Sequence, residues 1–147
     1  MLRKLMQALG PKPPKSAPLP DPDAELALGA LLVRVAMSDE NYQFVEISLI
    51  DKILARIYHH SPLEAAKIRA ICEKLHAAAP DTDTFAALIR ETTSHEERLE
   101  AIEAIWTVVL ADGREYETEI QMVEDIRMAL GLSHAESEAA HDRAKAE

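Results

Sequence analysis

The sequence predicts an all-α protein: a single compact bundle of about seven helices, built from two pseudo-symmetric halves and preceded by a short N-terminal helix and a proline-rich tether. Apolar residues recur at helical spacing, glycine is scarce at 4 of 147 residues, and strand-like runs that alternate valine, threonine and tyrosine are absent. Because 48% of the residues are apolar but only 4% are aromatic, aliphatic side chains must pack the core.

The first 22 residues are expected to precede the folded domain, which we place at residues 23–147. A short helix is predicted at the start, because four apolar side chains share one helical face: Leu2, Leu5, Met6 and Leu9. The stretch GPKPPKSAPLPDP then favours an extended tether. The short helix has two interpretations: a frayed end or flap that packs on the domain, or a segment that docks weakly on a partner or a membrane surface.

Two helices are predicted at the start of the domain. The first spans about residues 24–37, and its apolar stripe consists of Leu28, Leu31, Leu32 and Val35. The second spans about residues 43–59, and its stripe consists of Phe44, Ile47, Ile50, Leu54 and Ile57. We expect both stripes to face the core, because an amphipathic helix buries its apolar side.

A third and a fourth helix follow. Ser61 can cap free N–H groups, Pro62 suits the first helical position, and Glu64 completes a capping box, so a helix begins here. Pro80 and Asp81 end that helix. A short fourth helix is marked by three apolar residues: Phe85, Leu88 and Ile89.

Three more helices complete the prediction. A capping box at residues 94–97 opens a helix that continues through Val109. The next helix spans about residues 116–130 and ends at Gly131, a good C-terminal cap. A third capping box, at residues 133–136, opens a final polar helix.

The chain contains an internal repeat with an offset of 73 residues, in which residues 30–53 align with residues 103–126. Three correspondences support the alignment: Ser38-Asp39 with Ala111-Asp112, Glu46 with Glu119, and Lys52-Ile53 with Asp125-Ile126. Each half is therefore a helix, an acidic turn, a helix and a capping-box helix. Such halves can pack about a pseudo-twofold axis, which would bring equivalent features near each other.

An acidic turn with the pattern Asp-x6-Glu separates the first two helices of each half. Ca²⁺ and similar hard cations take roughly six to eight oxygen ligands, so one turn supplies too few and two turns brought together supply more. The candidate metal ligands are therefore Asp39, Glu46, Asp112 and Glu119. Further oxygens are available from Asn41, Glu115 and Glu117.

The same carboxylates also have a purely structural interpretation. An acidic side chain in the first turn of a helix complements the helix dipole and caps free N–H groups, which stabilises by about 0.3–1 kcal/mol. Asp39 and Asp112 would then bond backbone amides within their turns, and Gly113 would only supply backbone freedom. Both interpretations of the acidic turns stay open at this point.

Composition and motifs argue against several classes of function. The formal net charge is −10 and no basic stripe offsets it, so we expect no nucleic-acid partner. The six histidines lack the spacing of helical zinc sites and are expected at the surface or as caps. No phosphate loop or nucleophile elbow appears, so no catalytic residue is assigned and we expect no enzyme.

The compartment is expected to be the cytoplasm. Cys72 is the single cysteine, which allows no intramolecular disulfide. Cys72 and, separately, Trp106 are expected to be core residues. No stretch of about 20 apolar residues could span a bilayer, and the start is too short and polar for a secretory signal.

The acidic turns carry a resemblance to a known family. Residues 108–113, Val-Val-Leu-Ala-Asp-Gly, followed by Glu119, resemble the "ADG…E" signature of TerB-like (tellurite-resistance B-type) domains. That fold also appears as the N-terminal region of a membrane-anchored DnaJ-type co-chaperone. Residues 36–40 with Glu46 resemble the matching first-half signature, with serine and glutamate where alanine and glycine are usual.

The resemblance covers about residues 24–139. It implies an all-helical bundle of about seven helices, a role in tellurite or stress response, and metal binding by acidic residues, which carry over to Asp39, Glu46, Asp112 and Glu119. We therefore expect a non-enzymatic TerB-like accessory module that binds a divalent cation, Ca²⁺ or a similar hard ion. The alternatives are a metal-independent scaffold for a basic protein partner, and membrane contact through residues 1–10.

Overall fold

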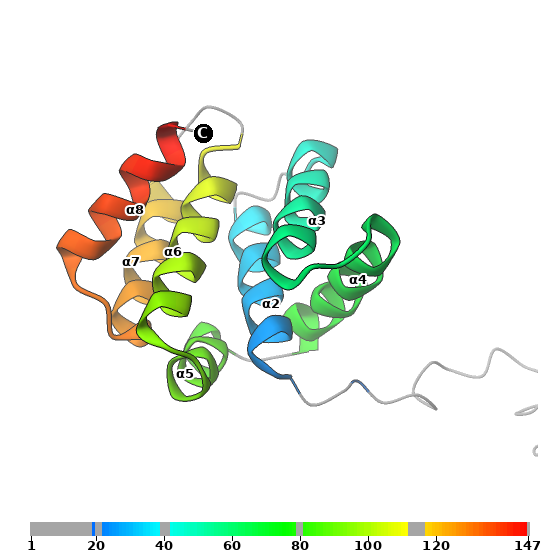
Figure 1. The fold of residues 1–147 in the computed structure, drawn as a ribbon, viewed down its shortest axis with the longest axis horizontal. Helices are drawn as coiled ribbons and strands as arrows, with labels where there is room; N and C mark the ends of the chain where they lie inside the picture. Colours follow the sequence, from blue (N-terminus) through cyan, green and yellow to red (C-terminus); the bar gives the residue numbers. More distant parts are fainter. Residues whose placement is uncertain (1–18, 20–21, 39–41, 79–80, 112–116, 147) are drawn as a thin grey trace, which may run out of the picture.

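The computed structural model describes residues 19, 22–38, 42–78, 81–111 and 117–146. These residues form α-helices and no strand, so the predicted all-α bundle is confirmed (Figure 1). The helices are α2 (Ala24–Met37), α3 (Phe44–Tyr58), α4 (Pro62–Ala78), α5 (Thr82–Thr92), α6 (His95–Val109), α7 (Glu117–Leu130) and α8 (His134–Ala146). The predicted N-terminal helix and most of the tether lie outside the described residues, and the division at residue 22 stays a prediction.

Helix α2 forms the centre of the bundle, because it is apolar on almost every side. Nine of its 14 residues are buried, including the whole predicted stripe of Leu28, Leu31, Leu32 and Val35. A helix without a polar face must be surrounded by other elements. Accordingly, α2 packs on α3, α4, α5, α6 and α7.

The two halves have matching architecture. Helices α2, α3 and α4 form the first half, and α6, α7 and α8 form the second (Figure 1). Helix α2 packs on α3 and α4 as α6 packs on α7 and α8, and α2 and α6 pack on each other. The contacts across the halves are reciprocal, α2 with α7 and α3 with α6. The two halves therefore match in these contacts, but α3 also packs on α4, whereas the described residues of α7 make no comparable contact with α8.

Helix α5 belongs to neither half and breaks the symmetry by packing on both α2 and α7. It runs antiparallel to α2. Near the end of α2, Arg34 Nη1 donates a hydrogen bond to Thr82 Oγ1 at the start of α5 (3.4 Å). At the other end, Ala24 and Thr93 line one small cavity. Helix α5 therefore contacts both α2, the central helix of the first half, and α7 of the second half.

The helix ends follow local sequence signals. In all three predicted capping boxes the serine hydroxyl and the glutamate carboxylate each accept a backbone N–H of the other residue: Ser61 with Glu64, Ser94 with Glu97, and Ser133 with Glu136. Gly131 follows α7 with φ of 75°, the left-handed conformation that glycine provides at helix ends. The predicted positions of these helix starts and of this C-terminal cap are confirmed.

One residue of the predicted core lies on the surface. The side chain of Phe44, the first residue of α3, is 81% exposed, although its spacing places it on the apolar stripe with Ile50 and Leu54, which are buried. Val45 beside it is also exposed. Periodicity identifies the face of a helix but not how far the neighbouring helices extend along it, and they do not cover the first turn of α3.

Two core side chains fasten pairs of helices, and both were expected in the core. Trp106 of α6 donates from Nε1 to Ser137 Oγ at 3.0 Å, and its ring stacks on His141 of α8 with the centroids 4.0 Å apart. Cys72 of α4 is buried against α2, where a Cβ placed on Gly29 would lie 2.3 Å from its Sγ. Helices α2 and α4 therefore approach each other closely at Gly29.

Candidate functional site

The segments that flank the two acidic turns lie at the same end of the bundle. Helices α2 and α6 run in the same direction, and α3 and α7 begin at the end where α2 and α6 finish, at the top of Figure 1. A surface hollow of about 400 Å³ is lined by Phe44 and Val45 of α3 and by Ala111, just after α6. The start of α3 in one half thus meets the end of α6 in the other.

Two of the four predicted metal ligands are described by the structure. Glu46 and Glu119 are the third residues of α3 and α7, and their exposed fractions are only 4% and 2%. Among the described residues no other charged side chain is buried so deeply. Asp39 and Asp112 lie outside the described residues.

Glu46 also has a structural role. Its Oε1 accepts a hydrogen bond from the backbone N–H of Gln43 at 3.0 Å, so the carboxylate caps the start of α3. Burying a carboxylate is costly unless hydrogen bonds or an opposite charge compensate, and this peptide N–H supplies part of the compensation. The capping interpretation of the acidic turns is therefore observed at Glu46.

The structure does not test the four-carboxylate site as a whole. Within the described ranges, no group of three or more histidine, cysteine, aspartate or glutamate side chains is arranged to hold a metal ion. Two of the four predicted ligands fall outside those ranges. The predicted cation site at Asp39, Glu46, Asp112 and Glu119 therefore stays a prediction.

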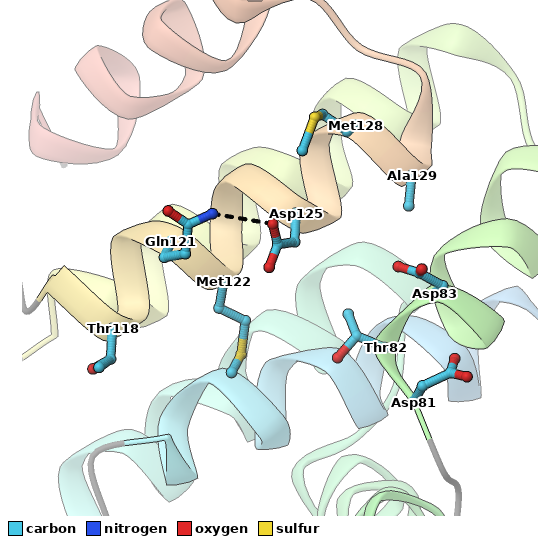
Figure 2. Close-up of a pocket in the computed structure, with 9 residues that line it drawn as sticks. All are labelled: Asp81, Thr82, Asp83, Thr118, Gln121, Met122, Asp125, Met128 and Ala129. Carbon is cyan, nitrogen blue, oxygen red and sulfur yellow. Dashed lines mark hydrogen bonds between the residues drawn. The ribbon is translucent and has the colours of Figure 1, made fainter.

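A groove of about 650 Å³ lies elsewhere on the bundle, between the start of α5 and one face of α7 (Figure 2). The residues that α7 contributes are three or four positions apart, as one helical face requires: Thr118, Gln121, Met122, Asp125, Met128 and Ala129. The start of α5 contributes Asp81, Thr82 and Asp83. Figure 2 shows Asp83 and Asp125 facing the same space from the two helices.

The groove is acidic. Three aspartates and no basic side chain are among the residues that line it. Asp81 caps α5, because its Oδ1 accepts the N–H and the hydroxyl of Thr84, each at 2.9 Å. These hydrogen bonds hold the pKa of Asp81 below its ordinary value, so its negative charge persists at neutral pH. Asp125 Oδ1 accepts a hydrogen bond from Gln121 Nε2 at 3.1 Å.

Comparison with known proteins places the chain in a family. The family model described as tellurite resistance protein TerB matches residues 25–142. The chain belongs to the TerB family. No curated protein and no solved structure shows significant similarity to it. Among the described helices, none combines the length and the apolar character that a transmembrane span needs.

The TerB match confirms the resemblance recognised at the acidic turns. It extends from α2 into α8, so both halves and both signature segments fall within it. The TerB signature gives no indication of the groove between α5 and α7. That groove combines Asp83 with Asp125, which come from distant parts of the chain, so no local spacing could have revealed it.

The histidines of this TerB chain are only partly as expected. His95 is exposed, but His76 Nδ1 accepts a hydrogen bond from Arg34 Nε at 2.9 Å and so joins α4 to α2. Burial, and then the positive charge of Arg34, lower the pKa of His76. The half-buried His141 stacks on Trp106. His76 and His141, like His60 beside Glu25, are therefore half-buried rather than fully exposed, because contacts between distant helices determine their environment.

Proposed function

We propose that this TerB-family chain is a non-enzymatic accessory module in a tellurite or stress response, and that it binds a divalent cation through its paired acidic turns. The proposed ligands are Asp39, Glu46, Asp112 and Glu119, and the proposed ion is Ca²⁺ or a similar hard cation. The proposed compartment is the cytoplasm, in keeping with the single cysteine.

The matching burial of Glu46 and Glu119 supports this proposal most strongly. Three other glutamates in the molecule cap helix starts without being buried: Glu64, Glu97 and Glu136. Capping alone therefore does not require a buried glutamate. The burial of Glu46 and Glu119 at equivalent positions of the two halves therefore supports a second role common to both halves.

A hard cation is a chemically suitable second role. Two glutamates and two aspartates supply carboxylate oxygens, and backbone carbonyls of the turns and water molecules can complete a coordination shell of roughly six to eight oxygens. The positive charge of the ion would offset the cost of burying the carboxylates. Carboxylates can also act as general acids or bases, so the assignment of this set to binding rather than to catalysis is part of the proposal.

Thermal unfolding of chelator-treated protein tests the proposal. The protein would be heated alone and with Ca²⁺, Mg²⁺, Mn²⁺ or Zn²⁺, with Trp106 fluorescence as the readout. An ion present at one hundred times its Kd stabilises the native state by about 2.7 kcal/mol, which corresponds to a Tm rise of roughly 5–11 °C for a chain of this size. We expect such a saturable rise with one ion. No rise with any ion would contradict the proposal.

A double substitution separates metal ligation from helix capping. In Glu46→Gln with Glu119→Gln, the side chains keep an acceptor oxygen, such as the one that binds the N–H of Gln43, but lose the charge that a hard cation needs. We expect the ion to raise Tm no longer, with little change in the metal-free Tm. A lowered metal-free Tm with an undiminished rise would assign these glutamates to capping.

Two further variants complete this experiment. Asp39→Asn with Asp112→Asn should also abolish the Tm rise if the aspartates are ligands. The matched control is Glu138→Gln with Asp142→Asn, which removes the same amount of charge. Glu138 and Asp142 are both exposed on α8, and this variant should retain the full rise.

The competing function is a metal-independent scaffold for a basic protein partner. The capping bond between Glu46 and Gln43 favours it, because this bond already occupies one carboxylate oxygen within the protein. The net charge of −10 is also suited to a basic partner. A scaffold predicts complexes that survive a chelator and weaken with added salt, since exposed charge contacts are screened. Pull-downs with and without chelator, at low and high salt, distinguish the two functions.

A further inference from the structure

The groove between α5 and α7 has an apolar part that no described element covers. Met128 is 54% exposed, and Met122, which packs against the core, lines the groove from another side of α7 (Figure 2). Methionine side chains are flexible and adapt to apolar partners of irregular shape. An exposed apolar strip with polar residues around it is typical of a surface that binds another segment.

The acidic rim of the groove restricts what that segment can be. Asp81, Asp83 and Asp125 line a space of about 650 Å³ without a basic side chain among the lining residues. An acidic segment would be repelled, and an apolar segment without charge would make no favourable contact with the negative charges of the rim. The complementary occupant is an amphipathic segment that carries both apolar and basic residues.

The chain itself contains a segment of this kind. Residues 1–20 include four basic residues and no acidic one, whereas the rest of the chain has 12 basic and 26 acidic residues. The four basic residues are Arg3, Lys4, Lys12 and Lys15. The predicted apolar face of the same segment consists of Leu2, Leu5, Met6 and Leu9. Its chemistry is therefore the complement of the groove.

The segment can reach the groove of its own chain. Arg34, which contacts Thr82 at the groove, is ten residues along α2 from Ala24. About 15 Å of helix therefore separates the start of α2 from the start of α5. Residues 10–22 between the segment and α2 can extend to about 40 Å. This tether is more than long enough for docking within one molecule.

We propose that residues 2–9 dock into the groove between α5 and α7 of the same chain. The apolar face of the segment packs on Met122 and Met128, and Arg3 and Lys4 lie against the aspartates of the rim. Because the segment is tethered, its effective concentration at the groove is on the order of millimolar, and modest contacts suffice. None of the four proposed metal ligands lines the groove, so this docking is independent of the cation proposal.

A paramagnetic label on the full-length chain tests the proposal. Gln7→Cys, with a nitroxide attached, places the label off the predicted apolar face of the segment. Cys72 does not compete for the reagent, because it is buried and burial raises the pKa of its thiol to about 12. We expect selective broadening of amide signals from the groove face of α7 and the first turn of α5, and not from the exposed face of α8. About 0.5 M NaCl, with a Debye length of roughly 4 Å, should reduce the broadening.

Charge reversal provides a sharper version of the experiment. Asp83→Lys with Asp125→Lys should abolish the selective broadening, and both side chains are exposed, so the fold should tolerate them. Adding Arg3→Glu and Lys4→Glu to that variant should restore it. Asp81 is left unchanged because it caps α5.

A matched control and four contrary outcomes complete the test. Reversing two charges on α8, with Glu138→Lys and Asp142→Lys, should leave the broadening as it is. Broadening that is uniform, or centred on Phe44 and Val45, would overturn the proposal. So would broadening that depends on protein concentration, which would assign the groove to a second copy of the chain. Binding of residues 1–10 to anionic lipid vesicles, with no broadening on α7, would overturn it in favour of a membrane surface.

Discussion

Gly29 and Cys72 pack directly against each other between α2 and α4. A larger side chain at one of these positions therefore requires a smaller one at the other. A Cβ on Gly29 would lie 2.3 Å from Cys72 Sγ, well inside the contact distance of the two atoms. Glycine in the middle of a helix costs about 1 kcal/mol relative to alanine. Gly29 has an ordinary helical conformation, so its backbone freedom is not needed at this position. We infer that glycine is required here because it has no side chain to collide with Cys72.

Gly29→Ala should lower the free energy of unfolding by about 1–3 kcal/mol, despite the better helix propensity of alanine, because the added methyl overpacks the interface. Cys72→Ala removes the sulfur, after which the nearest atom to the new methyl is the Cβ of residue 72, at 3.3 Å in this structure. The double variant should therefore be less destabilised than the sum of the single ones. Urea unfolding of all four proteins measures the coupling, and purely additive losses would contradict the prediction.

Sequence reasoning at the scale of single residues succeeded where neighbours along the helix determine the environment. Cys72 and Trp106 lie on apolar helix faces, and both are in the core as predicted. Sequence reasoning failed where a helix distant in the chain determines the environment of a side chain. His76 is held by Arg34, 42 positions earlier in the chain. Phe44 is exposed because none of the described helices covers the first turn of α3.

At the scale of helices, the starts that could be predicted are those encoded within four consecutive residues. Each of the three capping boxes contains its own donors and acceptors, so its geometry follows from local sequence alone. Packing partners are not encoded in this way. The contacts of α5 with α2 and α7 could not be predicted, and neither could the groove that α5 and α7 form.

The capping box of α6 gives a prediction for a whole helix. Ser94 Oγ accepts the N–H of Glu97 at 3.1 Å, so Ser94→Ala leaves that donor without its side-chain acceptor. We expect the free energy of unfolding to fall by about 1 kcal/mol. Ser94→Thr, which keeps the hydroxyl, is the matched control and should lose clearly less. Chemical denaturation followed by far-UV circular dichroism measures both, and equal losses would show that the hydroxyl does not stabilise the helix start.

At the scale of the whole molecule, the two halves share one core. Helices α2 and α6 pack on each other, and α5 packs on α2 from one half and α7 from the other. Neither half can lose its structure without exposing the buried face of the other half. The proposed metal ligands could be nominated from sequence because the repeat aligns Glu46 with Glu119. The burial of both residues depends on this shared packing.

This shared core predicts cooperative unfolding of both halves. Trp106 is the single tryptophan and reports on the second half, whereas far-UV circular dichroism reports on all helices. The two signals should give the same denaturation midpoint. Gly29→Ala, in the first half, should shift the Trp106 midpoint as much as the circular dichroism midpoint. A Trp106 midpoint unaffected by this substitution would show that the halves unfold independently.

The central position of α2 has a consequence for synthesis on the ribosome. Helix α2 is made before each of the described helices that pack on it, and Val109, at the end of α6, follows Met37 by 72 residues. At a synthesis rate of about 5–20 residues per second, α6 is completed on the order of 4–14 s after α2. The nine residues of α2 that are buried in the folded protein lack their contacts with α6 during this time. During that interval the nascent chain presents its most apolar helix to its surroundings. Early folding of α3 and α4 onto α2 would shorten this exposure, and a chaperone that binds short apolar helices would have its clearest target here.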